Sequence, residues 1–251
     1  MELDADRIRQ RVNFLDVPID IIAPDQIGNV IYEFLDKKEG RNIVLLSLWD
    51  LLRARRNSEY GKYVRNAALV IPISKSIVSG IRFLTGHKAF RYMPFDFIVN
   101  LLGILERREF SCYILGCKKS VLLKAERNIR QTFPKLLVVG RFAGYFKRQE
   151  EPVIIEAIRK ASPSLLLVGK GVRGEERWIA RNNASLGVGL RMWCSDLFEV
   201  FSERRKHPSR AVFDSGLEWV GYCFQEPFKF FRIFSFIYYN LLLLSNKLFV
   251  K

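Results

Sequence analysis

The chain has 251 residues, enough for one sizeable hydrophobic core with an appendage but too few for several large domains. Hydrophobic residues make up 49% of the sequence and aromatic residues 13%, which excludes a disordered chain. The 41 Lys and Arg outnumber the 26 Asp and Glu, and the formal net charge of +15 predicts an anionic partner: a nucleotide diphosphate, a nucleic acid or an acidic lipid surface.

The N-terminal stretch "MELDADRIRQ" alternates charges where a signal peptide needs an apolar core. We therefore expect a cytoplasmic protein. Its four cysteines include no C-x-x-C pair and its histidines number two, so the sequence predicts reduced, mostly buried thiols and no metal site.

Six short apolar runs predict strands, at residues 42–48, 68–73, 110–117, 135–142, 164–169 and 185–193. Segments of helical period lie between them; the clearest are 118–133, which stops at Pro134, and 151–163, with Pro152 in its first turn. This alternation predicts an α/β fold, a Rossmann-like and mostly parallel sheet with helices on both faces.

Ligands of such sheets bind along the edge where the strands end. The residues that follow the predicted strands are therefore the candidates for binding substrate. They are Ser47, Ser74, Gly144, Tyr145, Gly169, Gly171, Arg173, Glu176 and Asp196.

Residues 169–174 spell G-x-G-x-x-G after a strand, a pattern typical of dinucleotide binding, and Asp196 follows at about the distance of the acidic residue that takes the ribose hydroxyls. However, Glu175 and Glu176 occupy the expected first helical turn, where they would repel a bound diphosphate. We therefore interpret the glycines as a tight turn and place the two glutamates near sugar or base groups. Lys170 and Arg173 are the candidates for phosphate contacts.

The end of the chain differs from the rest. It is strongly aromatic, and residues 233–246 form a run of 14 uncharged residues, shorter than the roughly 20 that a membrane-spanning helix needs. We expect a helix that lies in the membrane interface; the alternative is a helix packed on the core. The predicted organisation is an α/β domain at 1–210 and a helical, membrane-associating appendage at 211–251.

Four segments together resemble the bacterial WecG/TagA/CpsF-type glycosyltransferases. They are "VNFLDVPID" near the start, "TFPKLLVVGRFAGYF", "VGKGVRGEERWIARNN" and, as the most specific, "GLEWVGYCFQEP". The resemblance implies transfer of N-acetylmannosamine or a related sugar, with inversion, from a UDP-sugar donor to a polyprenyl-diphosphate-linked sugar acceptor in cell-envelope or surface-glycan synthesis. It implies no cofactor, and it places the protein peripherally on the inner leaflet of the cytoplasmic membrane.

The chain departs from the family pattern at several site positions. Ile73 stands where the family has an aspartate proposed as catalytic base, Ser47 where it has an asparagine, Glu175 where it has a glutamine and Arg173 where it has a proline. Asp96 matches a retained family position. The resemblance places Lys229 and Arg232 toward the diphosphate and the membrane.

Four carboxylates are candidates to replace the missing base: Asp50, Asp96, Glu175 and Asp196. Each of them has an alternative, purely structural role, because carboxylates also cap helices and stabilise the positive end of a helix dipole. Asp96 is the preferred catalytic residue, followed by Glu175.

The sequence is also compatible with two other functions. Because isoleucine cannot take a proton, the chain could be a catalytically degenerate homologue that acts as a binding or scaffold subunit at the membrane. The positive charge also suggests nucleic-acid binding, but no compact basic and aromatic motif supports it, and we expect no nucleic-acid partner.

Overall fold

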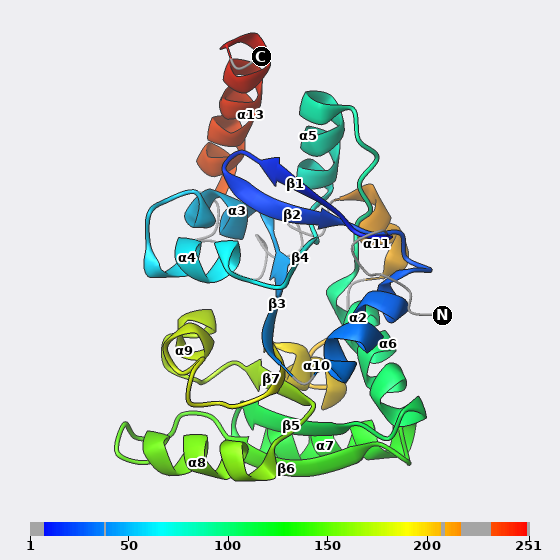
Figure 1. The fold of residues 1–251 in the computed structure, drawn as a ribbon, viewed down its shortest axis with the longest axis vertical. Helices are drawn as coiled ribbons and strands as arrows, with labels where there is room; N and C mark the ends of the chain where they lie inside the picture. The colour runs from blue at the N-terminus through cyan, green and yellow to red at the C-terminus, as the bar shows by residue number, and fades with distance from the viewer. Residues whose placement is uncertain (1–7, 38, 207–208, 217–231, 250–251) are drawn as a thin grey trace.

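The computed structural model describes residues 8–37, 39–206, 209–216 and 232–249 (Figure 1). Its main sheet has six parallel strands in the order β4-β3-β8-β7-β5-β6. These strands are β3 (Gly40–Leu46), β4 (Leu69–Pro72), β5 (Ser111–Gly116), β6 (Leu137–Ala143), β7 (Leu165–Gly169) and β8 (Gly189–Ser195). A separate antiparallel hairpin joins β1 (Gln10–Phe14) to β2 (Val17–Ile21). The predicted α/β fold with a mostly parallel sheet is confirmed.

All six predicted strands are present, and five of them start and end within two residues of the prediction. The exception is β8, which begins four residues later than predicted. Gly187 and Gly189 have φ angles of +75° and +99°, a left-handed conformation that ends the preceding turn and is not extended strand. The apolar pattern alone does not show this difference, because glycine and valine alternate through the turn.

Helices cover both faces of the sheet. One face is covered by α2 (Ile27–Asp36), α6 (Pro94–Arg107), α7 (Lys119–Thr132) and α10 (Leu197–Phe201). The opposite face is covered by the β1–β2 hairpin with α3 (Leu48–Ala54), α4 (Glu59–Arg65), α5 (Lys75–Thr85), α8 (Glu151–Ala161), α9 (Glu176–Arg181) and α13 (Arg232–Phe249). The short helix α11 (Arg210–Ser215) lies beside the start of α5, where Lys75 donates to the carbonyls of Asp214 and Ser215 at 3.2 Å (Figure 1).

The sheet has a hydrophobic core on each face. Neighbouring residues of a strand point to opposite faces, so Ile43 packs in the first core and Val44 in the second. The strands β4 and β7 are buried along their whole length, which explains why they appear in the sequence as continuous apolar runs. The helix α7 is amphipathic as predicted, with Val121 and Ile129 among its buried residues.

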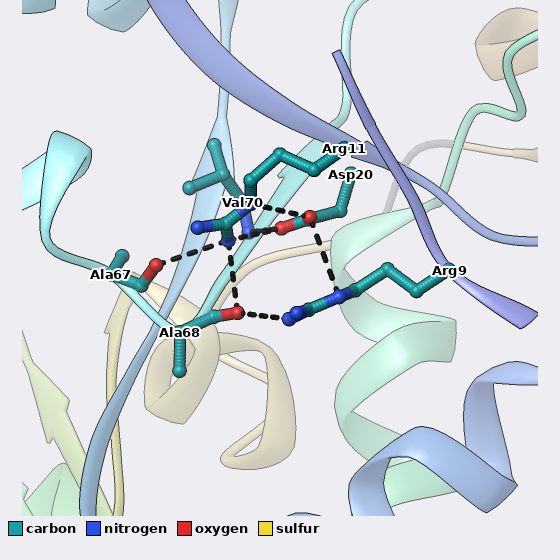
Figure 2. A network of polar contacts seen from close by, with 6 residues as sticks. All are labelled: Arg9, Arg11, Asp20, Ala67, Ala68 and Val70. Carbon is teal, nitrogen blue, oxygen red and sulfur yellow. Dashed lines mark hydrogen bonds and ion pairs between the residues drawn. The ribbon is translucent and has the colours of Figure 1, made fainter. Parts of the chain in front are cut away.

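A buried ionic network attaches the hairpin to the sheet (Figure 2). The side chain of Asp20 on β2 is fully buried, and its Oδ2 accepts hydrogen bonds from the backbone N–H of Val70 at 2.7 Å and from Arg11 at 2.7 Å. The guanidinium of Arg9 lies 3.8 Å from the same carboxylate. Both arginines also donate to the carbonyl of Ala68, at 2.7 and 2.9 Å. The carboxylate thus holds the hairpin on the backbone of β4.

The C-terminal helix α13 packs against α5 at one end of the molecule (Figure 1). Tyr239 is buried and donates a 2.7 Å hydrogen bond to the carbonyl of Ser76, and Leu243 is buried beside it. Lys247 donates to the carbonyl of Phe83 at 3.1 Å. Within the described residues, no helix combines the length and the hydropathy needed to cross a bilayer.

The order of the strands creates a crevice between β3 and β8. The chain leaves β3 into α3 on one face of the sheet and leaves β8 into α10 on the opposite face. Neighbouring strands whose connections diverge in this way open a binding crevice at their carboxyl ends.

Candidate active site

A cleft of about 1140 Å³ occupies this position. Its floor is formed by the ends of β3, β4, β7 and β8, and its walls come from α3, α5, α6, α10 and the C-terminal helix α13. The polar and charged residues that line it include Ser47, Asp50, Arg53, Ser74, Lys75, Lys170, Glu175, Glu176, Asp196, Arg205 and Lys206. Apolar side chains of α13, including Ile233, Phe236 and Leu243, line it as well.

Two serines fix the backbone where β3 and β4 end. Ser47 is the N-cap of α3; its Oγ accepts from the N–H of Asp50 at 3.3 Å and donates to the carboxylate of Asp50 at 2.5 Å. Ser74 Oγ accepts from the N–H of Leu48 at 3.0 Å. The predicted residues Ser47 and Ser74 therefore hold the first turn of α3, and with it Asp50, against the end of β4.

The strongest electrostatic feature of the cleft is a pair of carboxylates that share one arginine. Arg53 Nη2 lies 3.4 Å from Asp50 Oδ1 and 3.2 Å from Glu176 Oε1. The guanidinium of Arg53 also stacks over the ring of Tyr60 at 3.7 Å, which orients it. Asp50 and Arg53 come from α3 and Glu176 from the first turn of α9, so this cluster joins the segment after β3 to the segment after β7.

Glu176 is the buried member of the pair, with 13% of its side chain exposed. Burial, followed by the negative charge of Asp50, raises the pKa of Glu176 from 4.5 to about 7, although Arg53 acts in the opposite direction. A carboxyl group with such a pKa exchanges its proton near neutral pH, which is the property of a general acid or base.

Asp196 lies on the other side of the crevice, after β8. Its carboxylate forms an ion pair with Arg205, which follows α10. Ser195 before it has a φ of +48°, and Glu175 has a φ of +56°. Non-glycine residues adopt this conformation at a cost, and such positions cluster at functional sites.

The predicted glycine positions form the support under the cleft and are not among its lining residues. A Cβ on Gly169 would lie 2.6 Å from the ring of Phe198, and one on Gly144 would lie 3.0 Å from the carbonyl oxygen of Lys170. Gly171 has a φ of +92°, and its carbonyl accepts from the N–H of Tyr145 at 2.7 Å. These residues interlock the turns that follow β5, β6 and β7.

The remaining predicted site residues are distributed as follows. Asp96 is exposed in the first turn of α6 and does not line the cleft, although Met93 and Phe95 before it do. Arg173 is exposed and is not a lining residue, whereas Glu175 is exposed and lines the cleft. Lys229 lies outside the described residues, as does the signature from Leu217 to Pro227. Arg232 begins α13, and its side chain is not described.

Sequence reasoning missed Arg53 and the burial of Glu176. The spacing of Asp50 and Arg53, three residues apart on a helix that follows a strand, is a signal for a paired face. The approach of α9 to that face, however, follows from tertiary packing.

Among the described residues, no group of three or more His, Cys, Asp or Glu side chains is placed to hold a metal ion.

A parallel α/β sheet with a crevice at its switch point, lined by carboxylates, cations and an apolar wall, is typical of α/β enzymes. The sequence model of the Glycosyl transferase WecG/TagA/CpsF family matches residues 12–251, and the chain belongs to this family of glycosyltransferases.

Two curated relatives are similar to this chain over most of their length. Both are named N-acetylglucosaminyldiphosphoundecaprenol N-acetyl-beta-D-mannosaminyltransferase. The protein of Bacillus subtilis is 21% identical over 214 residues, 85% of this chain and 83% of the relative. The protein of Bacillus spizizenii is 21% identical over 224 residues, 89% of this chain and 86% of the relative.

Proposed function

We propose that the protein transfers N-acetylmannosamine or a related sugar, with inversion, from a UDP-sugar to a polyprenyl-diphosphate-linked sugar in cell-envelope or surface-glycan synthesis. The observation that carries the proposal is the composition of the cleft. It combines proton-accepting carboxylates at its floor with cationic side chains and an apolar wall, and such a transfer needs all three. The names of the two relatives support the same acceptor and sugar class.

The reaction joins the attacking hydroxyl oxygen of the acceptor to the anomeric carbon of the donor sugar. The bond from that carbon to the diphosphate breaks, and UDP departs with the bonding electrons. Lys170 after β7 and Lys206 after α10 line the cleft and are suited to contact the diphosphate of the donor. Ser47, Ser74, Glu175, Glu176 and Asp196 are proposed to surround the sugars.

The predicted residues Gly144, Tyr145, Gly169, Gly171 and Arg173 take a different part in this proposal. Their interlocked turns hold the end of β7 and the start of α9 in place, and so act through Glu176 rather than on the substrate directly. Lys229 and Arg232 remain proposed contacts for the diphosphate and membrane headgroups.

The membrane part of the proposal concerns the outer face of α13. Ile237, Leu241, Leu244 and Leu248 follow each other at helical spacing and are 50%, 60%, 52% and 71% exposed. Opposite them, Tyr239 and Leu243 attach the helix to the core and close the cleft. We propose that residues 211–251 form an appendage to an α/β domain at 1–210, and that the apolar stripe enters the inner leaflet of the cytoplasmic membrane beside the polyprenyl acceptor.

Purified protein incubated with UDP-N-acetylmannosamine and polyprenyl-diphosphate-linked N-acetylglucosamine tests the transfer. The expected result is a disaccharide product together with one UDP per sugar transferred. The absence of product, together with the absence of UDP-sugar binding in calorimetry, would refute the enzymatic proposal.

Sedimentation with anionic phospholipid vesicles tests the membrane contact. Leu244→Glu should weaken binding much more than Ser245→Glu, because both variants add one negative charge but only the first removes an apolar side chain from the stripe. Equal losses in the two variants would show that charge alone, rather than insertion of α13, governs binding.

One observation favours a second candidate, a catalytically degenerate binding subunit. Ile73 lines the cleft and cannot accept a proton. Product formed by Ile73→Asp but not by the wild type would support this candidate, whereas turnover by the wild type excludes it.

A further inference from the structure

Among the described carboxylates that line the cleft, Glu176 has the least exposed side chain, at 13%, and it shares Arg53 with a second carboxylate, Asp50. Its Oε1 and Asp50 Oδ1 approach the same nitrogen of Arg53, at 3.2 and 3.4 Å. The two acidic groups come from different helices, α9 and α3, and meet directly above the end of β3. Such pairs are characteristic of sites in which one carboxyl group carries a proton that the other does not.

This cluster lies beside the position that an ionisable group would occupy if residue 73 were acidic. The N–H of Ile73 donates to the carbonyl of Leu46 at 3.0 Å, and the neighbouring Ser74 accepts from the N–H of Leu48. The turn after β4 therefore lies against the first turn of α3, which carries Asp50. Because Ile73 has no ionisable group, the carboxylates in this part of the cleft are those of Asp50 and Glu176.

We propose that Glu176 is the general base of the transfer and that Asp50 and Arg53 are positioning residues that set its proton affinity; this assignment rests on the proposed function. The carboxylate of Glu176 takes the proton of the acceptor hydroxyl while the oxygen of that hydroxyl forms a bond to the anomeric carbon of the donor sugar. The bond to the UDP oxygen breaks in the same step, and UDP leaves with the electron pair. The proton on Glu176 is released to water after the products depart.

The other acidic residues of the site are less suited to this role. Asp96 does not line the cleft, and Glu175 is exposed. Asp196 is engaged by Arg205, and the carboxylate of Asp50 accepts a hydrogen bond from Ser47 in addition to its contact with Arg53.

The charged and titratable groups that face Glu176 determine its behaviour with pH. From α3 these are Asp50, which favours the protonated form, and Arg53, which favours the ionised form. Glu175 on its own turn adds a smaller repulsion. From α4, Tyr60 and Tyr63 are buried phenols whose pKa values are raised by burial, so they remain neutral. From β8, Arg191 is buried and engages Asn183 and the carbonyl of Gly187.

The test compares the pH dependence of kcat/KM in four proteins. In the wild type, the rate should fall on the acid side with a midpoint near pH 7, because the base must be ionised. Arg53→Met should move this midpoint to higher pH, and Asp50→Asn should move it to lower pH. Glu176→Gln should reduce kcat by about 100-fold or more, with UDP-sugar binding in calorimetry retained.

Glu59→Gln serves as the matched control, because Glu59 is an exposed glutamate on α4 outside the cleft and in an ion pair with Arg181. It should retain the wild-type rate and pH profile. If Glu176→Gln transfers sugar within a few-fold of the wild type, or if the acid midpoint is the same in Arg53→Met and Asp50→Asn, the assignment of the base is wrong while the proposed function stands. If the wild type transfers no sugar, the proposed function fails, and this assignment fails with it.

Discussion

Replacing Glu176 by glutamine is expected to stabilise the folded protein at pH 8 while removing its activity. The pKa of this carboxyl group is raised in the folded state from 4.5 to about 7 because the side chain is buried and close to Asp50. Between these two pH values the folded state holds a proton that the unfolded state has released. The free energy of unfolding of the wild type therefore falls as pH rises through this window and levels off above about pH 7.

The size of this effect follows from the difference between the two pKa values, about 2.5. At roughly 1.4 kcal/mol per pKa unit, ionisation of Glu176 costs the folded state about 3 kcal/mol at pH 8. Because only 13% of the side chain is exposed, solvent screening removes little of this cost. Glutamine does not ionise, so the stability of Glu176→Gln relative to the wild type should increase by about this amount between pH 4.5 and pH 8.

Urea denaturation at a series of pH values, followed by tryptophan fluorescence, measures this difference. Glu175→Gln is the control, because the neighbouring glutamate is exposed and adds only a smaller repulsion to Glu176, so the same substitution there should change the pH dependence of stability much less. A difference between Glu176→Gln and the wild type that is constant from pH 4.5 to pH 8 would show that the carboxyl group does not carry the raised pKa.

Three further predictions concern the fold. Asp20→Ala should lower the free energy of unfolding in urea by about 3 kcal/mol, since it leaves two arginines and the N–H of Val70 without their carboxylate; a loss below about 1 kcal/mol would contradict this. Gly80→Ala places a Cβ 2.1 Å from Tyr239 Oη, so hydrogen exchange in residues 232–249 should accelerate markedly, and unchanged protection would refute the packing of α13 on α5. In a Cys223→Ser chain, the buried thiols of Cys112 and Cys117, whose pKa values burial raises to about 12, should react with a disulfide reagent at pH 8 roughly a thousand-fold more slowly than in urea; similar rates would show that they are accessible.

The sequence predicts the sheet well because its strands are buried on both faces. Continuous apolar runs such as β7 leave little doubt about where a parallel strand lies. The predicted location of the site at the carboxyl ends of the strands stays a prediction; a cleft lies at these ends, and Ser47, Ser74, Glu175 and Asp196 line it.

The order of the strands in the sheet cannot be read from the sequence. This order explains why some of the predicted site residues do not line the cleft. The cleft is bounded by β4, β3, β8 and β7, whereas β5 and β6 lie beyond β7 in the sheet. Gly144 and Tyr145 follow β6, so they contact the turns after β5 and β7 and do not line the cleft. Similarly, Asp96 has a carboxylate that could act as a base, but α6 presents Phe95 and Ile98 to the cleft and leaves Asp96 exposed.

The central place of β8 also has a consequence for how the chain folds during synthesis. β8 is the last strand among the residues that the structure describes, yet its partners are β3, about 150 residues earlier, and β7. A nascent chain that has emerged only as far as β7 can pair β3 with β4, and β5 with β6 and β7, but nothing joins the two groups, and each exposes an open strand edge. Truncation before Gly189 should therefore yield an aggregation-prone chain instead of a smaller stable domain. The crevice between β3 and β8 exists only once β8 is in place, so the candidate active site forms together with the complete sheet.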